Sequence, residues 1–198
     1  MSTTQKIASN TAVQVAGKII ATFLGLLGVG MLTRYLGAEQ FGWYITTISF
    51  LQFIGICIDF GMVPVTAQML SEPAFDKKKL FQNLLAFRFF TAIIFLAIAP
   101  IIAFFFPYPT EVKIAIGFTS IAFLAISMNQ VLIGLYQERL KTHIYALGEV
   151  LSRLVLVGGF SLAIYFQKSF IPIMGVVTLS SVVYTIFLWV KAHQITPA

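Results

Sequence analysis

The sequence predicts an all-α integral membrane protein whose six transmembrane helices form one bundle. Of its 198 residues 59% are hydrophobic and only 10% are charged, whereas an ordinary soluble domain is about 25% charged. The mean hydropathy is +0.92. The apolar residues gather in runs of the roughly 20 residues that cross about 30 Å of hydrocarbon. The expected spans are 11–33, 43–69, 80–106, 113–136, 144–166 and 170–190.

The same composition excludes several classes of protein. So little polar surface does not coat a water-soluble particle, which argues against a cytosolic enzyme. The runs are longer than barrel strands and lack their alternation. A single cysteine, Cys57, excludes an intramolecular disulfide. The 13 basic residues exceed the seven acidic ones, but they cluster in short breaks between apolar runs, so we interpret them as topology signals and expect no nucleic-acid partner.

The first run, 11–33, is predicted to stay in the membrane, because it is too long for a cleavable signal peptide and contains polar residues. Two stripes follow its helical period. One is polar and recurs every four residues: Asn10, Gln14, Lys18 and Thr22. The other consists of small residues and would let another helix come close: Gly17, Ala21 and Gly25.

The second and third runs each carry one ionisable residue. In 43–69, Gln52 and Asp59 are seven residues apart on one face, with Gly55 between them. In 80–106, Arg88 lies one to two turns after Asn83. These positions predict that both helices present polar groups to the interior of the bundle.

The last three runs continue this pattern. The fourth, 113–136, contains Asn129 and Gln130, and the sixth, 170–190, contributes hydroxyl groups. In the fifth, 144–166, Glu149 precedes Arg153 by four residues, the favourable order for an ion pair within a helix. All six helices are therefore expected to supply polar groups.

The basic residues outside the runs predict the orientation. Seven lie on the side of the N-terminus and three on the other, so both termini are expected to be cytoplasmic. The seven are Lys6, Lys77, Lys78, Lys79, Arg139, Lys141 and Lys191; the three are Arg34, Lys113 and Lys168.

The five ionisable residues inside the runs are the candidate functional residues, because a charge in the hydrocarbon is costly and is usually paired or facing water. With this topology they share one layer in the inner half of the membrane, roughly 12 to 18 Å from the cytoplasmic helix ends. We predict a cationic lumen of Lys18, Arg88 and Arg153, which suits an anionic ligand, with Asp59 and Glu149 tuning it or carrying a proton. The polar lining would be Asn10, Gln14, Thr22, Gln52 and Asn83.

Structural alternatives stay open for each charge. Glu149 and Arg153 would form a pair that neutralises itself. Arg88 would extend its long apolar stem toward the surface near 77–79. Lys18 would form a salt bridge with Asp59 between the first two helices. His143 and His193 lie outside the runs without a second ligand nearby, so we expect neither a metal site nor a cofactor.

Two short motifs suggest a family. The first loop reads RYLGAEQFGWY at 34–44, and the second helix carries DFGM at 59–62. Together with the Asn- and Gln-containing start of the first span and the basic QERLK at 137–141, they resemble the polysaccharide-unit flippases of the O-antigen (Wzx) type, which belong to the multidrug/oligosaccharidyl-lipid/polysaccharide (MOP) superfamily. The resemblance covers all six expected spans.

This resemblance implies a transporter that moves an undecaprenyl-pyrophosphate-linked glycan, such as an O-antigen unit of lipopolysaccharide, across the bacterial cytoplasmic (inner) membrane by alternating access. Two six-helix bundles would enclose a cationic cavity containing Lys18, Arg88 and Arg153. The chain holds one such bundle, half of a transporter with twelve or more helices. Its expected partners are therefore membrane lipid, the lipid-linked oligosaccharide, a second half (same chain, homodimer or partner protein), and the glycan polymerase and glycosyltransferases.

Three other functions stay open. A drug or small-solute exporter of the same superfamily should have acids in its lumen. A non-transporting membrane scaffold for glycan-assembly enzymes should have mutually paired charges. A membrane glycosyl- or phosphotransferase usually places acids or histidines in sizeable loops, and every loop here is short, so we expect no enzyme.

Overall fold

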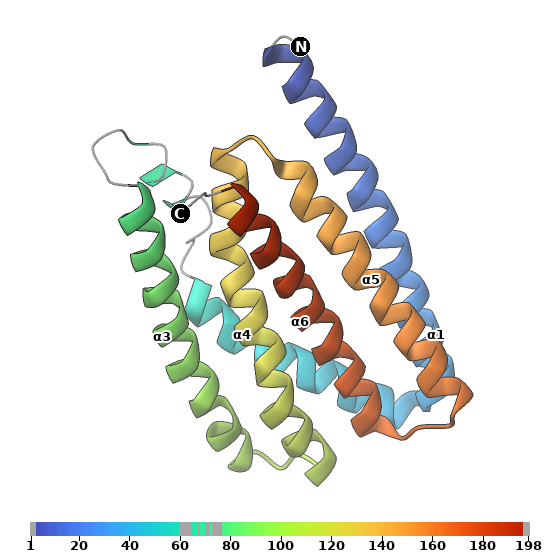
Figure 1. The fold of residues 1–198 in the computed structure, drawn as a ribbon. Helices are drawn as coiled ribbons and strands as arrows, with labels where there is room; N and C mark the ends of the chain where they lie inside the picture. The colour runs from blue at the N-terminus through green and yellow to red at the C-terminus, as the bar shows by residue number, and fades with distance from the viewer. Residues whose placement is uncertain (1–2, 60–64, 67, 70–71, 73–76, 196–198) are drawn as a thin grey trace.

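The computed structural model describes residues 3–59, 65–66, 68–69, 72 and 77–195. Within these ranges the chain is helical and contains no strand (Figure 1). Among the described residues, five helices are long and apolar enough to cross a membrane. They are α1 (Thr3–Asp59), α3 (Lys77–Phe104), α4 (Thr110–Glu138), α5 (Thr142–Tyr165) and α6 (Phe170–Ile195).

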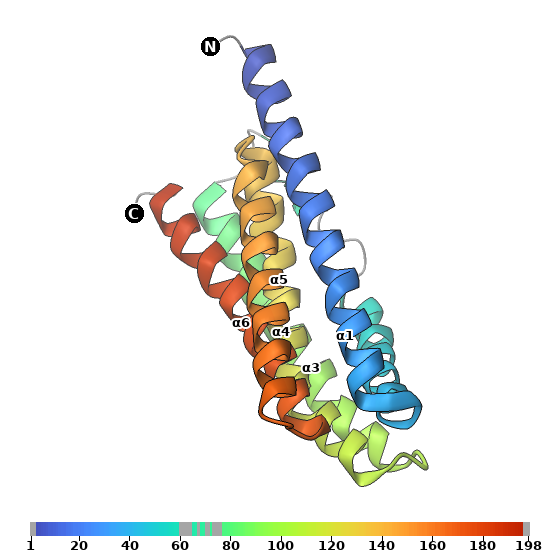
Figure 2. The same ribbon diagram turned by 90° about the vertical axis from the view of Figure 1, so that its right-hand side faces the viewer.

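The first two predicted spans both lie in α1. This helix has 57 residues, so a straight helix would extend about 85 Å, far beyond the roughly 30 Å of hydrocarbon. It folds back at Gly37, whose φ of 68° and ψ of 179° are not helical. The first limb (3–36) and the second limb (38–59) meet at this bend, far from the N-terminus (Figure 2).

One sequence prediction changes here. The segment 34–44 was expected to be a loop, but it is helical on both sides of Gly37, because one residue with a glycine-type backbone conformation suffices to reverse the chain. The described part of the span 43–69 in α1 ends at Asp59. The other four helices agree with their predicted spans to within a few residues, whereas the count of six stays a prediction.

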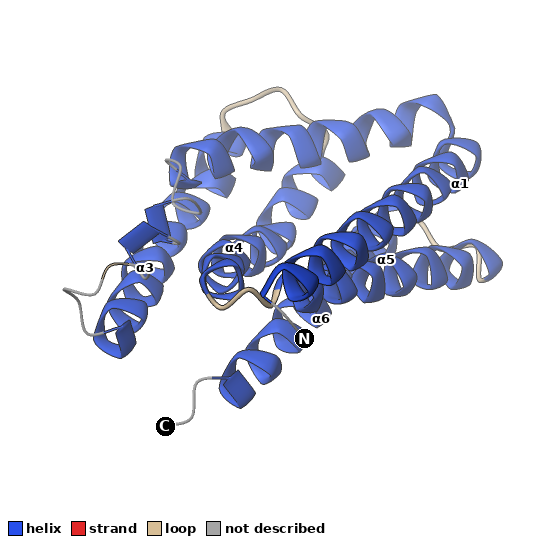
Figure 3. Cartoon of the chain, turned by 90° about the horizontal axis from the view of Figure 1, so that it is seen from above, coloured by secondary structure: helices blue, strands red, loops and turns tan. Residues whose placement is uncertain are grey.

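Helix α4 runs through the centre of the bundle and packs against all the other helices. Its buried side includes many small residues, which allow close helix packing without the hydrophobic effect to drive it. Seen from above, the two limbs of α1 and the helices α3, α5 and α6 surround it (Figure 3). Because α4 is in contact with the other described helices, it has the largest buried share of the five apolar helices.

Buried residues form three apolar clusters. One lies near the bend of α1 and joins the first limb to α4, α5 and α6 through Leu32, Phe160 and Met174. The second joins the second limb to α3 and α4. The third joins α4 to α6, where the Tyr136 hydroxyl donates a 2.6 Å hydrogen bond to the Leu188 carbonyl.

The outer surface is strongly apolar. Large side chains on every helix are exposed, among them Phe23, Ile56, Phe104 and Leu162, each 60% or more. A soluble protein rarely exposes apolar surface on this scale, whereas lipid tails solvate it well. The exposed surface therefore supports a membrane location.

Candidate functional site

Helices α1 and α5 pack closely along the predicted stripe of small residues. A Cβ atom on Gly17 would lie 3.1 Å from the Cβ atom of Ala146, and Ala21 is 1% exposed. A Cβ atom on Gly28 would lie 3.4 Å from Leu156. The stripe therefore does what its spacing predicts, and it brings the first limb within side-chain reach of α5.

The predicted polar stripe lies along the same contact between α1 and α5, which we call the seam. There it meets polar residues of α5. Nδ1 of His143 lies 2.9 Å from Oδ1 of Asn10. The Gln14 side-chain amide donates to the Tyr145 hydroxyl. The contacting residues advance by four at each step on α1 and by two and then four on α5, so consecutive polar residues of α1 contact consecutive polar residues of α5.

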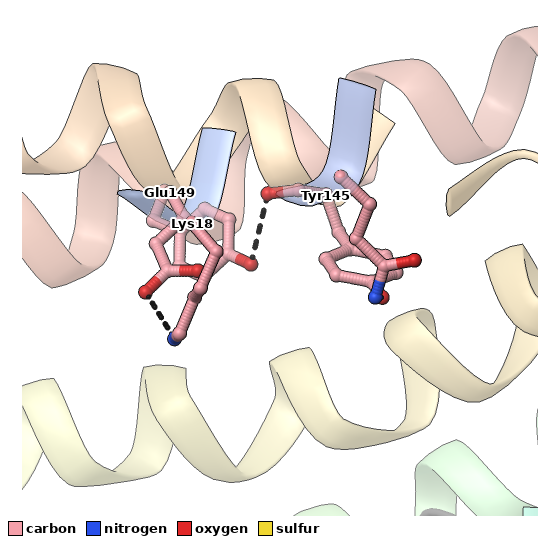
Figure 4. Close-up of polar contacts among 5 residues, drawn as sticks. Lys18, Tyr145 and Glu149 are labelled. Carbon is pink, nitrogen blue, oxygen red and sulfur yellow. Dashed lines mark hydrogen bonds and ion pairs between the residues drawn. The ribbon is translucent and has the colours of Figure 1, made fainter. Parts of the chain in front are cut away.

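The third polar contact between α1 and α5 is an ion pair. Nζ of Lys18 lies 2.9 Å from Oε1 of Glu149 (Figure 4). The Lys18 side chain is 68% exposed and that of Glu149 is 23% exposed. Lys18 is eight residues, roughly 12 Å, into the apolar span that begins at Asn10. An exposed ion pair at that depth is unfavourable against lipid tails, so this face requires water or another chain.

Arg153 lies one turn beyond Glu149 on α5. A Cβ atom on Gly25 of the first limb would lie 3.7 Å from its Cζ atom, and Tyr44 of the second limb is within electrostatic range. The guanidinium thus lies close to both limbs of α1. Among the described residues Arg153 makes no ion pair, because Glu149 bonds to Lys18.

The intrahelical pair of Glu149 and Arg153, one of the alternatives left by the sequence, is therefore absent. A carboxylate four residues before an arginine can reach it, but α5 packs so tightly on α1 that an ammonium from the neighbouring helix is closer. The two cations and one acid leave one positive charge on this seam. We call Lys18, Glu149 and Arg153 the seam cluster.

Arg88 is separate from the seam cluster. It is 1% exposed and lies among the second limb, α3 and α4. Its Nε donates a 3.3 Å hydrogen bond to the Ser127 carbonyl, and its terminal nitrogen donates to the Ile58 carbonyl. These bonds hold the guanidinium inside the bundle, so it does not extend to the surface as one alternative predicted.

A cavity of about 330 Å³ adjoins Arg88. Gln52 and Gly55 of the second limb line it, together with Ser127 and Gln130 of α4. The single polar layer expected from sequence is thus divided into two sets, one between α1 and α5 and one among α1, α3 and α4, because the bend of α1 places its two limbs on different neighbours.

The remaining predicted lining residues differ in their surroundings. Thr22 continues the polar stripe and is exposed. Asn83 is exposed on α3. Asp59 is the last residue of α1, and its side chain, with the proposed pairing to Lys18, lies outside the described residues.

Sequence reasoning missed Tyr145. A signal was present, since Tyr145, Glu149 and Arg153 recur every four residues just as the stripe of α1 does. It also missed Ser127, whose backbone carbonyl, not its side chain, holds Arg88. Every residue has a backbone carbonyl, so the sequence does not indicate which one accepts a hydrogen bond from Arg88.

Comparison with known proteins adds one relationship. No curated protein and no solved structure matches the chain. The sequence profile of a family described as polysaccharide biosynthesis protein matches residues 31–197. This match includes Arg88, Glu149 and Arg153 and covers most of the chain. The chain therefore belongs to the polysaccharide biosynthesis protein family.

Proposed function

We propose that the chain is one six-helix half of a flippase that moves a lipid-linked polysaccharide unit across the bacterial cytoplasmic membrane by alternating access. Family membership supports a role in polysaccharide synthesis or transport. The proposal rests above all on the ion pair of Lys18 and Glu149, exposed at membrane depth with Arg153 one turn beyond. Such a face needs an aqueous cavity.

The physical logic concerns the glycan headgroup. A phosphorylated sugar cannot cross hydrocarbon unaided, because its charges and hydroxyl groups would lose their hydration. The seam cluster offers one surplus positive charge for phosphate, and the amides of Asn10 and Gln14 lie on the same stripe for sugar hydroxyls. The lipid tail stays in the bilayer, and no covalent step is required.

A second bundle would complete the cavity. The exposed side of the seam is one wall, and an equivalent six-helix half, from the same protein, a second copy or a partner, would provide the other. In this proposal the six spans include the two limbs of α1 and both termini lie in the cytoplasm, an orientation favoured by the seven basic residues expected on the side of the N-terminus.

Two functions compete with this proposal. A scaffold for glycan-assembly enzymes is favoured by one observation, the mutual pairing of Lys18 and Glu149. An exporter of cationic drugs fits less well, because two cations face one acid on the seam. A scaffold requires no glycan to pass along the seam, so transport measurements distinguish the scaffold from the flippase.

The test replaces Lys18 and Arg153 by Gln in cells that depend on this protein for glycan export. The control replaces Arg34 and Lys168 by Gln, which removes two exposed cations at the opposite end of the bundle. We expect export to fall at least ten-fold in the first variant and to stay normal in the control, with equal protein levels. Intact export in the first variant would exclude the transport proposal.

A further inference from the structure

A second cavity lies at the end of the bundle where α5 begins and α6 ends. Its volume is about 390 Å³. Three basic side chains line it: Lys141, which directly precedes α5, His143 of α5 and Lys191 of α6. Its other lining residues are Ile144, Leu147, Phe187 and Gln194, so within the described part of the chain no acidic side chain lines it.

The cavity changes from basic to apolar with depth along both helices. Lys141, just before α5, is followed by Ile144 and Leu147 of α5, and Leu147 lies about 9 Å further into the membrane. On α6, Lys191 lies one turn nearer the helix end than Phe187. Both walls therefore place an ammonium group at the headgroup level and apolar side chains below it.

The apolar end of the cavity lies beside a close helix contact. A Cβ atom on Gly148 would lie 2.8 Å from atoms of Phe187 and Tyr184. Helices α5 and α6 thus touch one residue beyond Leu147, which is itself 54% exposed. A molecule that enters from the helix ends would meet this contact and turn its apolar part toward the exposed Leu147 and the surrounding lipid.

Within the described residues, neither Lys141 nor Lys191 is paired with an acidic side chain, so both ammonium groups can bind an anion. Nζ of Lys191 lies 3.3 Å from Oε1 of Gln194, a neutral partner. Among the described residues the Lys141 ammonium makes no hydrogen bond or ion pair. By contrast, nearby Arg139 is 2.9 Å from the Glu138 carboxylate and does not line the cavity.

We propose that this cavity binds the headgroup of an anionic membrane phospholipid, with its phosphate at Lys141 and Lys191 and an acyl chain along Leu147 and Phe187. Basic pockets between helix ends are typical sites for anionic lipid headgroups. A free anion would use the lysines but not the apolar wall. This site shares no residue with the seam cluster, although His143, which lines it, contacts Asn10 of the polar stripe, and lipid binding here does not require that the chain transports a glycan.

The test measures lipid retention on the full-length chain by native mass spectrometry in detergent, with phosphatidylglycerol as the probe and phosphatidylcholine as the neutral comparison. We expect one tightly held phosphatidylglycerol per chain. Lys141→Gln and Lys191→Gln should each weaken it about five-fold, because one lysine near a membrane surface contributes about 1 kcal/mol. The Lys→Arg versions should retain the lipid.

The matched control is Arg139→Gln, which removes one cation at the same end without touching the cavity. Equal loss in this variant would reduce the effect to general surface charge and overturn the proposal. Equal retention of phosphatidylcholine, or displacement of the lipid by millimolar inorganic phosphate, would also overturn it. Thermal unfolding in the same detergent verifies that each variant is folded.

Discussion

The ammonium group of Lys18 in α1 lies 2.9 Å from a carboxylate oxygen of Glu149 in α5, 131 residues further along the chain. Above it, Gln14 meets Tyr145 and Asn10 meets His143. This series of polar contacts runs beside a stripe of small residues that allows the helices to approach. The first limb is thereby fixed to α5 by side chains that lipid could not solvate.

The first prediction concerns the strength of this ion pair. A double-mutant cycle with Lys18→Gln and Glu149→Gln should give a coupling free energy of about 0.5 kcal/mol, because the Lys18 side chain is 68% exposed and exposed pairs are weak. Denaturant unfolding in detergent measures it. A coupling above about 3 kcal/mol would mean that the pair is desolvated and that the seam does not face water.

Arg88 should behave as a structural residue. Its guanidinium is 1% exposed and bonds to backbone carbonyl groups of two other helices. Arg88→Gln should therefore lower the free energy of unfolding by about 3 kcal/mol, since a buried network loses its central donor. Thermal unfolding and protein level in cells report the loss. Lys18→Gln is the comparison and should leave both nearly unchanged.

Neighbouring glycines in α5 offer a matched pair of substitutions. A Cβ atom on Gly159 would lie 2.4 Å from Cγ1 of Val176, a stiff side chain, whereas one on Gly158 would meet nothing within 4 Å. Gly159→Ala should destabilise by about 1–3 kcal/mol, and Gly158→Ala should stabilise by up to about 1 kcal/mol. Equal thermal stabilities of the two variants would show that α5 and α6 do not pack as described.

The bend of α1 depends on Gly37. Its combination of φ 68° and ψ 179° is almost restricted to glycine. Gly37→Ala is expected to cost about 1–3 kcal/mol even though a Cβ atom there has open space around it. Gly42→Ala is the control, because it also has open space but lies in helical backbone. A similar unfolding temperature for both variants would argue against the bend.

Asn129 should tolerate an apolar replacement. It is 3% exposed, and both polar atoms of its side chain have no hydrogen-bond partner in the described structure. Asn129→Leu has nearly the same shape and removes a penalty of about 1–3 kcal/mol. We expect a higher unfolding temperature. If the variant is instead destabilised, Asn129 has a partner in the folded protein.

The sequence was sufficient to predict long apolar helices and two stripes on the first of them, but it did not predict that α5 is the neighbour of these stripes or that Lys18 pairs with Glu149. Long apolar runs identify membrane helices because hydrocarbon admits little else, and a stripe of small residues at helical spacing identifies a face on which another helix can pack. The bend at Gly37 could not be predicted, because its only sign in the sequence is one glycine, and many glycines lie within straight helices. The separation of Arg88 from Lys18 could not be predicted either. It depends on the direction that the second limb of α1 takes after the bend, since Arg88 packs against that limb and Lys18 lies on the first.

Cysteine labelling can establish whether the polar stripe of α1 faces water at membrane depth. Cys57→Ser first removes the chain's one cysteine. Thr22→Cys then probes the stripe, and Ile20→Cys, also exposed but nearly opposite on the helix, serves as the lipid-facing control. We expect a membrane-impermeant maleimide to label residue 22 in cells much faster than residue 20. Equal protection of both positions would contradict it.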